Sequence, residues 1–382
     1  MNDPAALLPR HVPVLRYDSQ EPYFADSPAI WTANPGNELR RADGTILATV
    51  GGGDGHPELS LQTLSPGGYP DPRAGDRIAD TTARGEASYV SQAAALHADP
   101  RFANRVYGHV ATDGDGRTWL AYWFFYFYND FNLVGPFLHA GCHEGDWEMI
   151  QLRLDAAGST PDLAVYAQHR HAGERAWDAL EREGERPVVY PARGSHASYF
   201  SAGVHWTGEW FDNADGAHRG PELTLHVLTA ADGWAQWPGL WGGTVAPAND
   251  PNPLDDSSPR GPGHHAQWTD PGSLLATARE HDAQRGARAA PAPPATPRIA
   301  AAAHGADLRI VYDTGGPKAV GLVLATGGDG APRNVDRVRV DGRRARVTVP
   351  GAAPAPGATI HVSLATADGA SSPSRPVTVN PA

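Results

Sequence analysis

Residues 143–148 read His-Glu-Gly-Asp-Trp-Glu and place one imidazole and three carboxylates within six positions. The following segment, Met149–Leu154, has the residue types of a β-strand, in which alternate side chains share a face. Glu144, Asp146 and Glu148 have the same parity as the aliphatic residues of that segment. If the aliphatic residues face the core, the acids point inward too. Buried carboxylates are costly unless paired or bound to a cation, so the motif predicts a divalent-metal site.

Two more histidines follow strand-like segments, where a β-sandwich places its binding loops. His169 comes after Leu163–Tyr166, and His196 comes after Val188–Tyr190. A mixed nitrogen and oxygen ligand set suits Zn, Mn, Fe or Mg, whereas a set dominated by carboxylates favours Mg or Ca, and the sequence leaves the identity of the metal open. The predicted metal ligands are His143, Asp146, Glu148 and His169, with Glu144 and His196 as the predicted catalytic residues.

Each of these residues also has a purely structural interpretation. The three acids are compatible with a solvated loop, and Gly145 permits a bulge that breaks the strand alternation. A strand-end histidine is more often a hydrogen-bonded core residue than a ligand. Asp130 is a further carboxylate candidate or a simple turn residue. Nucleophilic catalysis is disfavoured, because the chain has no Gly-x-Ser-x-Gly elbow.

The bulk composition limits the class of protein. The chain has 382 residues and a formal net charge of −12, which disfavours general nucleic-acid binding. Cys142 is the single cysteine, so no intrachain disulfide can form. Residues 1–10 lack the features of a secretory signal, and no apolar run is long enough to span a membrane. We therefore expect a cytoplasmic protein. The abundance of Ala, Gly, Pro and Arg, with Lys318 the one lysine, suggests a bacterial source.

Composition divides the chain into three parts. Residues 1–285 contain all 11 tryptophans and form the predicted main β-rich domain. Residues 286–298 are built from Ala, Pro and Arg and predict an extended linker. Residues 299–382 contain six short strand-like runs separated by Gly, Asp and Pro, which predict a small sandwich of immunoglobulin or fibronectin-III type. We expect this last domain to be an accessory module, with glycan or protein-partner binding as the alternative.

The main domain is predicted to be a large β-sandwich, jelly-roll-like, with short helices. Trp119–Tyr128 is bulky at both parities, so as a strand it must be covered on both faces. The same strand could instead line an apolar cavity beside the acids, which would suit an amphiphilic ligand. Two helices are expected at Ala87–His97 and Ser273–Gln284, and Asp113–Gly116 predicts a hairpin turn.

Tyr122–Asn129, His143–Glu148 and Gly194–Phe200 form an ordered series, which Trp241-Gly242 and Gln267-Trp268 continue. This series resembles the bacterial branch of the vacuolar protein sorting-associated protein 62 family. The resemblance covers roughly residues 10–275 and leaves out the C-terminal sandwich. This resemblance indicates the fold of the chain better than its activity.

Residues 141–148, Gly-Cys-His-Glu-Gly-Asp-Trp-Glu, are also similar to the Gly-His-Arg-His-Asp-Trp-Glu motif of necrosis-inducing cytolysins of plant pathogens. This similarity implies that Asp146 and Glu148 help to bind a divalent cation. The present chain has one extra residue between His143 and Asp146, so the correspondence is closer for the acids than for the histidine. The cytolysins are secreted sandwich proteins that bind membrane sphingolipids, and their lytic role is not carried over.

These features predict a divalent-metal-dependent enzyme of hydrolytic or eliminating type, acting on a small-molecule substrate. Its metal would polarise a substrate oxygen or activate a water molecule, with Glu144 as a general base. The alternative is a non-catalytic protein that binds a lipid or a glycan through its cation. A third interpretation is a cation or an ion-pair network that only holds the strands together.

Overall fold

The computed structural model describes residues 4–83, 86–130, 142–206, 211–243, 258–287, 298–304, 307–314, 319–326, 334–342, 344–349, 358–366 and 375–381. These residues form two compact units. The first unit takes the described residues up to 281 except 202–215, and the second takes 202–215 and those after 281. Each unit has its own arrangement of strands.

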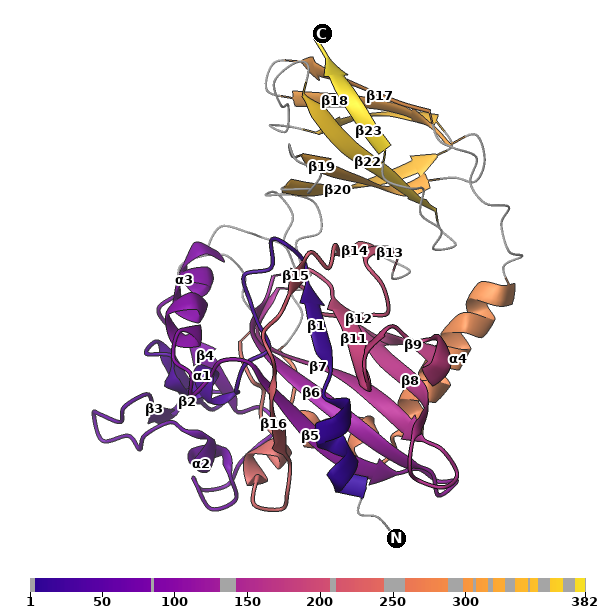
Figure 1. Cartoon of the computed structure of the whole chain (residues 1–382). Coiled ribbons are helices and arrows are strands. Elements are labelled where there is room, and N and C mark those ends of the chain that lie inside the picture. Colours follow the sequence, from indigo (N-terminus) through magenta and orange to yellow (C-terminus); the bar gives the residue numbers. More distant parts are fainter. Residues whose placement is uncertain are drawn as a thin grey trace. The chain divides into compact units, whose positions relative to one another are not determined.

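The frame of the first unit is a six-stranded sheet (Figure 1). Its strands are β5 (Arg105–Thr112), β6 (Thr118–Asn129), β7 (His143–Leu154), β8 (Pro161–Gln168), β9 (His171–Ala176) and β16 (Thr224–Val227). Their order is β16-β5-β6-β7-β8-β9, and neighbours are antiparallel except for the parallel pair β16 and β5. The predicted turn Asp113–Gly116 lies between β5 and β6. The two longest strands, β6 and β7, lie at the centre.

Strand β6 is buried on both faces, as its bulky residues at both parities predict. Even-numbered residues of Leu120–Tyr126 pack in one cluster with Ile150 of β7. Odd-numbered residues of Trp119–Phe127 pack in another cluster with Met149. The sheet therefore separates two hydrophobic cores, and each core needs its own covering layer.

A second sheet covers the face that carries Ile150. Its order is β10-β11-β1-β15, with β12 paired to β11. The side chains of Leu15 and Val189 from this sheet belong to the same core as the even-numbered residues of β6, so the two sheets form a sandwich. The elements of this layer are η1 (Pro4–His11), β1 (Val14–Tyr17), η2 (Trp177–Ala179), β10 (Arg182–Glu183), β11 (Arg186–Pro191), β12 (Ser198–Tyr199) and β15 (His218–Arg219).

Short helices and a three-stranded sheet cover the opposite face. Their buried side chains, among them Trp31, Tyr89 and Leu275, join the core of the odd-numbered residues. Both predicted helices are confirmed as α3 and α4. The elements are α1 (Ala29–Ala33), β2 (Asn37–Arg40), β3 (Ile46–Thr49), α2 (Leu61–Leu64), β4 (Arg77–Asp80), α3 (Glu86–His97), η3 (Gly233–Gln236), η4 (Pro262–His264), η5 (Ala266–Trp268) and α4 (Gly272–Ala287).

The second unit is the small β-sandwich predicted for the C-terminal segment. Its seven-stranded path runs β20-β19-β22-β23-β17-β18-β21, and a separate hairpin pairs β13 with β14. Leu308, Ile310 and Val362 are among its buried core residues. The strands are β13 (Gly203–Trp206), β14 (Phe211–Ala214), β17 (Arg298–His304), β18 (Asp307–Asp313), β19 (Ala319–Thr326), β20 (Asn334–Gly342), β21 (Arg344–Val349), β22 (Thr359–Thr366) and β23 (Arg375–Asn380).

The mainly β fold class is therefore confirmed, and all six strand-like runs of residues 299–382 are strands. The prediction missed β17, whose sequence Arg-Ile-Ala-Ala-Ala-Ala-His is rich in alanine, a residue depleted from strands. Most of the predicted linker lies outside the described residues, which resume at Arg298 after the end of α4. No helix in the described part of the chain is both long and apolar enough to cross a membrane.

Candidate functional site

The acidic motif is itself part of strand β7, which begins at His143 and not, as the residue types suggested, after the motif. Asp146 lies opposite Tyr126 of β6, and Glu144 lies opposite Tyr128. Asp146 is only 4% exposed, although it is a charged residue in the centre of a sheet. A carboxylate buried to this degree requires a compensating partner.

His196 is that partner. Its Nδ1–H donates to Oδ2 of Asp146 at 2.9 Å, and its Nε2 lies 3.4 Å from Oε1 of Glu21. The imidazole ring stacks on Tyr126 with 3.9 Å between ring centroids and 3° between ring planes. His196 is fully buried, so it holds Asp146 in position from within the core and has no surface for a substrate.

The three charges stabilise one another. Burial alone would lower the pKa of His196, but the charge of Glu21 and the hydrogen bond to Asp146 raise that pKa to about 9. Burial pushes the pKa of Asp146 upward, yet the hydrogen bond from His196 and the charge of His143 bring the pKa below its ordinary value. The group is therefore an imidazolium held between two carboxylates at neutral pH.

The loop between β11 and β12 delivers His196 to this position. The residue has φ of +54°, in the left-handed region that non-glycine residues seldom adopt. Its backbone N–H donates to the carbonyl of Ala192, and the N–H of Gly194 donates to Oε2 of Glu21. These bonds fix the loop to the N-terminal segment, so the unfavourable backbone conformation is maintained by its surroundings.

His143 is oriented toward the other oxygen of Asp146. Its Nδ1–H donates to the carbonyl of Gly145 at 2.9 Å, so in the neutral form of the ring the lone pair is on Nε2. That Nε2 lies 3.9 Å from Oδ1 of Asp146, which is too far for a hydrogen bond. Their separation is compatible with both atoms binding one cation. The side chain of each is oriented by a hydrogen bond through its other polar atom, as in protein metal sites.

Glu148 and His169 lie near this pair. Glu148 is half-buried opposite Phe124 of β6, and its charge helps to raise the pKa of Tyr126, the ring that neighbours Asp146. His169 is exposed in the turn between β8 and β9, and its charge is one of those that lower the pKa of Asp146. No group of three or more His, Cys, Asp and Glu side chains has metal-site geometry within the residues that the structure describes.

Glu144 belongs to a different environment, although its parity matches that of Asp146. Gly145 adopts φ of +58°, and the strand alternation changes there. Glu144 accepts hydrogen bonds from the Tyr89 hydroxyl at 2.7 Å and from the backbone N–H of Gly243 at 2.8 Å. Tyr89 belongs to the core on the opposite face from Tyr126, so the expectation that all three acids point the same way fails for Glu144.

Burial governs the charge of Glu144. It raises the pKa of this carboxyl to about 7, and the hydrogen bonds from Tyr89 and from the Gly243 and Asp80 backbone oppose that effect. A carboxyl with this pKa is half-protonated near neutral pH. The value suits acid–base chemistry, but the side chain is enclosed by its hydrogen-bond donors.

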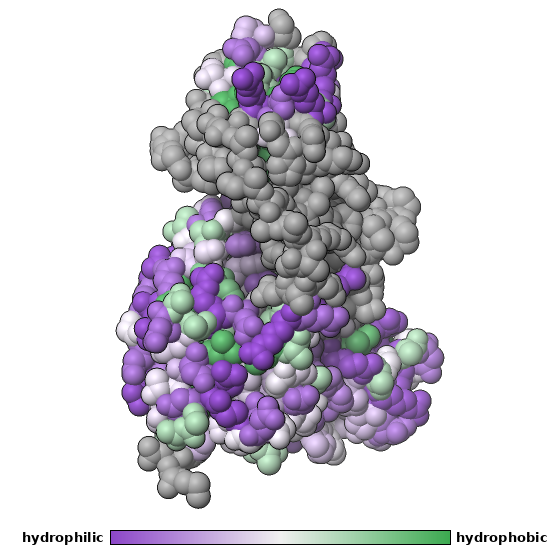
Figure 2. All heavy atoms as spheres, turned by 90° about the vertical axis from the view of Figure 1, so that its right-hand side faces the viewer, coloured by the Kyte–Doolittle hydropathy of each residue, from purple (hydrophilic) through white to green (hydrophobic). Residues whose placement is uncertain are grey.

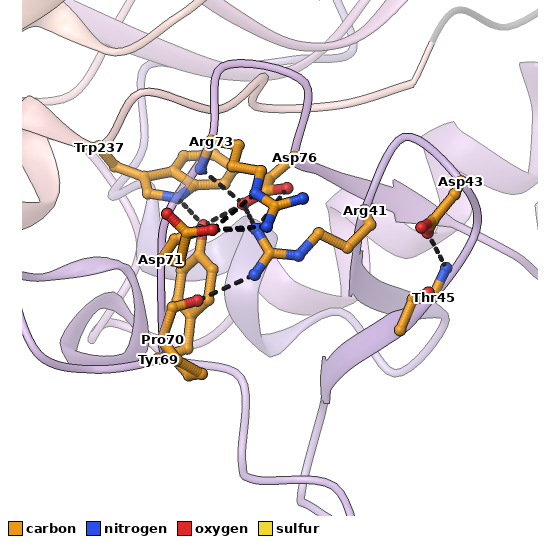
Figure 3. A network of polar contacts seen from close by, with 9 residues as sticks. All are labelled: Arg41, Asp43, Thr45, Tyr69, Pro70, Asp71, Arg73, Asp76 and Trp237. Carbon is orange, nitrogen blue, oxygen red and sulfur yellow. Dashed lines mark hydrogen bonds and ion pairs between the residues drawn. The ribbon is translucent and has the colours of Figure 1, made fainter.

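A polar network fixes the segments that enclose Glu144 (Figure 3). The buried Asp76 accepts hydrogen bonds from the Tyr69 hydroxyl and the Arg73 backbone N–H, both at 2.8 Å, and pairs with Arg41 at 2.9 Å. Trp237 Nε1 donates to the Tyr69 hydroxyl at 2.8 Å. Asp76 immediately precedes β4, and Trp237 immediately follows η3. The network thereby positions the two segments whose backbone N–H groups bind the Glu144 carboxylate.

Sequence reasoning identified His143, Asp146 and His196 but missed Glu21. No local pattern marks Glu21, because its segment is irregular and lies 175 positions before His196 along the chain. The role of Glu21 depends on contacts that only the folded chain brings together.

Asp130, the further carboxylate candidate, has its Oδ1 3.9 Å from Sγ of Cys142.

Comparisons with known proteins give one curated relative and one solved structure. No family model matches the chain. The chain is 31% identical over 182 residues to Putative vacuolar protein sorting-associated protein TDA6 of Saccharomyces cerevisiae, a match that covers 36% of this chain and 38% of the yeast protein. The chain is therefore similar to a vacuolar protein sorting-associated protein over about a third of its length. This match supports the predicted resemblance to vacuolar protein sorting-associated proteins, but not the assignment to a bacterial branch.

The solved structure is that of necrosis and ethylene inducing protein 2 from the causal agent of witches' broom disease of cocoa. It aligns with a TM-score of 0.25 and 15% identity, covering 58% of this chain and 83% of that chain. A TM-score this low adds nothing to the fold described above.

Proposed function

We propose that this chain binds a divalent cation between His143 and Asp146 and uses it to catalyse hydrolysis or elimination on an oxygen-bearing substrate. One observation carries the proposal: Nε2 of His143 faces Oδ1 of Asp146 at 3.9 Å, and neither atom is used by the hydrogen bond that orients its own side chain. An imidazole nitrogen and a carboxylate oxygen are suitable ligands for Zn, Mn or Mg.

The surrounding residues have distinct roles in this proposal. His196 positions Asp146, and Glu21 keeps His196 charged. Glu148 and His169 are the remaining proposed ligands, because the charge of His169 acts on Asp146 and that of Glu148 acts on the neighbouring Tyr126. The bound cation would polarise a substrate oxygen or lower the pKa of a water molecule.

Glu144 was predicted to be a general base. Its pKa of about 7 fits that task, but Tyr89 and two backbone N–H groups already occupy its oxygens. We therefore assign Glu144 to the packing of β7 against β4, and we assign no proton transfer to it.

A second candidate is non-catalytic, cation-dependent binding of a lipid or a glycan. The burial of the proposed ligands favours the third interpretation, a cation that only holds the strands together, since His143 is 8% exposed and Asp146 is 4% exposed. A largely enclosed ligand set is typical of structural sites, whereas catalytic sites keep an open coordination position.

Cation binding is tested by plasma mass spectrometry and calorimetric titration with Mg, Ca, Mn and Zn salts. The wild-type chain should bind about one equivalent, and Asp146→Asn should weaken binding on the order of 100-fold. Asp178→Asn, at an exposed aspartate in η2, is the matched control and should bind as the wild type does. Equal affinity in Asp146→Asn and the control would exclude this site. Turnover of phosphate or carboxylate ester libraries would then separate the enzyme from the binding protein.

We also infer that residues 10–275 are a bacterial member of the vacuolar protein sorting-associated protein 62 family. The yeast similarity and the ordered segments of β6, β7 and the His196 loop support this inference. The sorting role in the relative's name is not carried to this chain, and a cytoplasmic location is part of the same inference.

A further inference from the structure

The outer face of three neighbouring strands in the second unit is unusually basic. β17, β18 and β21 lie side by side, and their registers pair Ala300 with Val311 and Val311 with Arg346. Side chains at alternate positions are exposed, whereas those between them form the core of the sandwich. The exposed set on this face is Arg298, Ala300, Arg309, Val311, Arg344, Arg346 and Thr348.

Val311 is at the centre of this face. It is 46% exposed and is the one exposed large hydrophobic residue in the described part of the chain. Elsewhere, hydrophobic residues on the face drawn in Figure 2 lie in small patches among hydrophilic ones. Val311 lines an open hollow of about 440 Å³, and Ala300, its register partner on β17, adds to the apolar floor of this hollow. This volume is within the usual range of small-ligand sites.

Arginines surround the apolar floor. Arg298 and Arg344 line the hollow directly, and Arg346 lies beside Val311 on the next strand. Asp307 and Asp313 are the two acids of β18 on this face, and Asp313 pairs with Arg344 at 2.7 Å. Arg298 and Arg346 form no ion pair with any described residue. Their guanidinium groups are therefore available for a ligand, and guanidinium binds carboxylate through two parallel hydrogen bonds.

The charge of the C-terminal segment differs in sign from that of the rest of the chain. Residues 298–382 contain 10 Lys and Arg against 6 Asp and Glu, a net charge of +4, so the total of −12 leaves −16 for residues 1–297. A basic segment in an otherwise acidic chain favours an acidic partner for that segment.

We propose that the outer face of β17, β18 and β21 binds an acidic glycan, with sugar carboxylates on Arg298 and Arg346 and a sugar ring packed on Val311. The hollow has the size of a small ligand, and its aliphatic floor suits the C–H faces of a pyranose. An extended anionic surface such as a membrane or DNA would also repel the strongly acidic remainder of the chain. A glycan strand contacts the basic face alone.

The test is calorimetric titration of the full chain with oligogalacturonate and with neutral oligogalactan of the same length. Titrations contain EDTA and low salt, so that the proposed cation site cannot contribute. The proposal expects binding of oligogalacturonate only, weakened roughly 10-fold or more in the double variant Arg298→Gln/Arg346→Gln. Arg279→Gln removes an exposed arginine of α4 in the first unit and should leave the affinity unchanged.

A second variant separates a specific site from general charge attraction. Val311→Ser keeps every charge but removes the apolar floor, so it should weaken oligogalacturonate binding several-fold at the same salt concentration. No binding by the wild type, or equal binding by the double variant, would overturn the proposal. Tighter binding to phosphatidylserine vesicles or to DNA than to oligogalacturonate would also overturn it. Unchanged melting temperatures of the variants show that the exposed substitutions leave the fold intact.

Discussion

At the scale of single residues, Gly145 decides which way the acids of the motif point. Its φ of +58° allows Glu144 and Asp146, two positions apart, to enter different cores. A Cβ at this position would also lie 2.2 Å from the carbonyl oxygen of Trp241. Both facts require glycine, and both depend on the folded structure.

Replacing Gly145 by alanine should therefore destabilise the protein strongly. We expect Gly145→Ala to lower the free energy of unfolding by about 3 kcal/mol, because backbone strain and the Trp241 contact add. Gly184→Ala is the control: Gly184 has φ of +68°, but its Cβ would meet no atom within 4 Å. That variant should lose only about 1 kcal/mol. Urea denaturation measures both, and equal losses would contradict the role of the Trp241 contact.

A second residue-scale prediction concerns His97. Its Nδ1 donates to the buried Asp26 at 2.9 Å, and this hydrogen bond raises the pKa of His97. A raised folded-state pKa stabilises the fold fully below the unfolded value of 6.5, and that contribution is lost as pH rises through the folded value. The wild type should thus lose stability from about pH 6.5 upward.

The variant His97→Gln tests this assignment. It should be about 1–3 kcal/mol less stable than the wild type at pH 6, and the difference should shrink as the pH rises. The same substitution at the exposed His218 controls for loss of an imidazole. A difference that stays constant with pH would show that the Asp26 contact does not titrate. Melting temperatures measured between pH 5.5 and about 8.5 give the profile.

At the scale of elements, the Asp76 network links β4 to the segment after η3 (Figure 3). Asp76→Asn should cost about 3–5 kcal/mol, because Arg41 would be left without its buried carboxylate. Tyr69→Phe removes one hydroxyl and should cost about 1 kcal/mol. Asp43→Asn, at an exposed aspartate that accepts a hydrogen bond from the Thr45 N–H, is the control and should leave stability unchanged. A similar loss for Asp76 and Asp43 in chemical denaturation would refute the importance of burial here.

At the scale of the whole molecule, the chain is divided into two compact units. The predicted linker at residues 286–298 has arginines at 288 and 298, and Arg285 directly precedes it. Brief digestion with trypsin should first release two fragments separated within this stretch, as identified by mass spectrometry. Early cleavage inside the β6–β7 sheet instead would contradict the domain boundaries predicted from composition.

Elements with a strong residue pattern are predictable from the local sequence. The two-residue period of β7 and of the C-terminal strands is visible locally, because a strand presents alternate side chains to the core, whereas β6 is marked by bulky residues at both parities. The sequence also identified His143, Asp146 and His196 as the residues to examine. The prediction failed for β17, since a run of alanines has no strand signal and forms a strand only by pairing with β18 and β23.

The environment of each charged residue depends on contacts between distant segments of the folded chain. Glu21 reaches His196, Asp80 and Gly243 reach Glu144, and the strand parity changes at Gly145, through contacts between segments tens to more than a hundred residues apart. Burial fixes the protonation of these groups, and burial is a property of the packed molecule. Local sequence therefore indicated which residues could do chemistry, and only the fold determined which of them face one another.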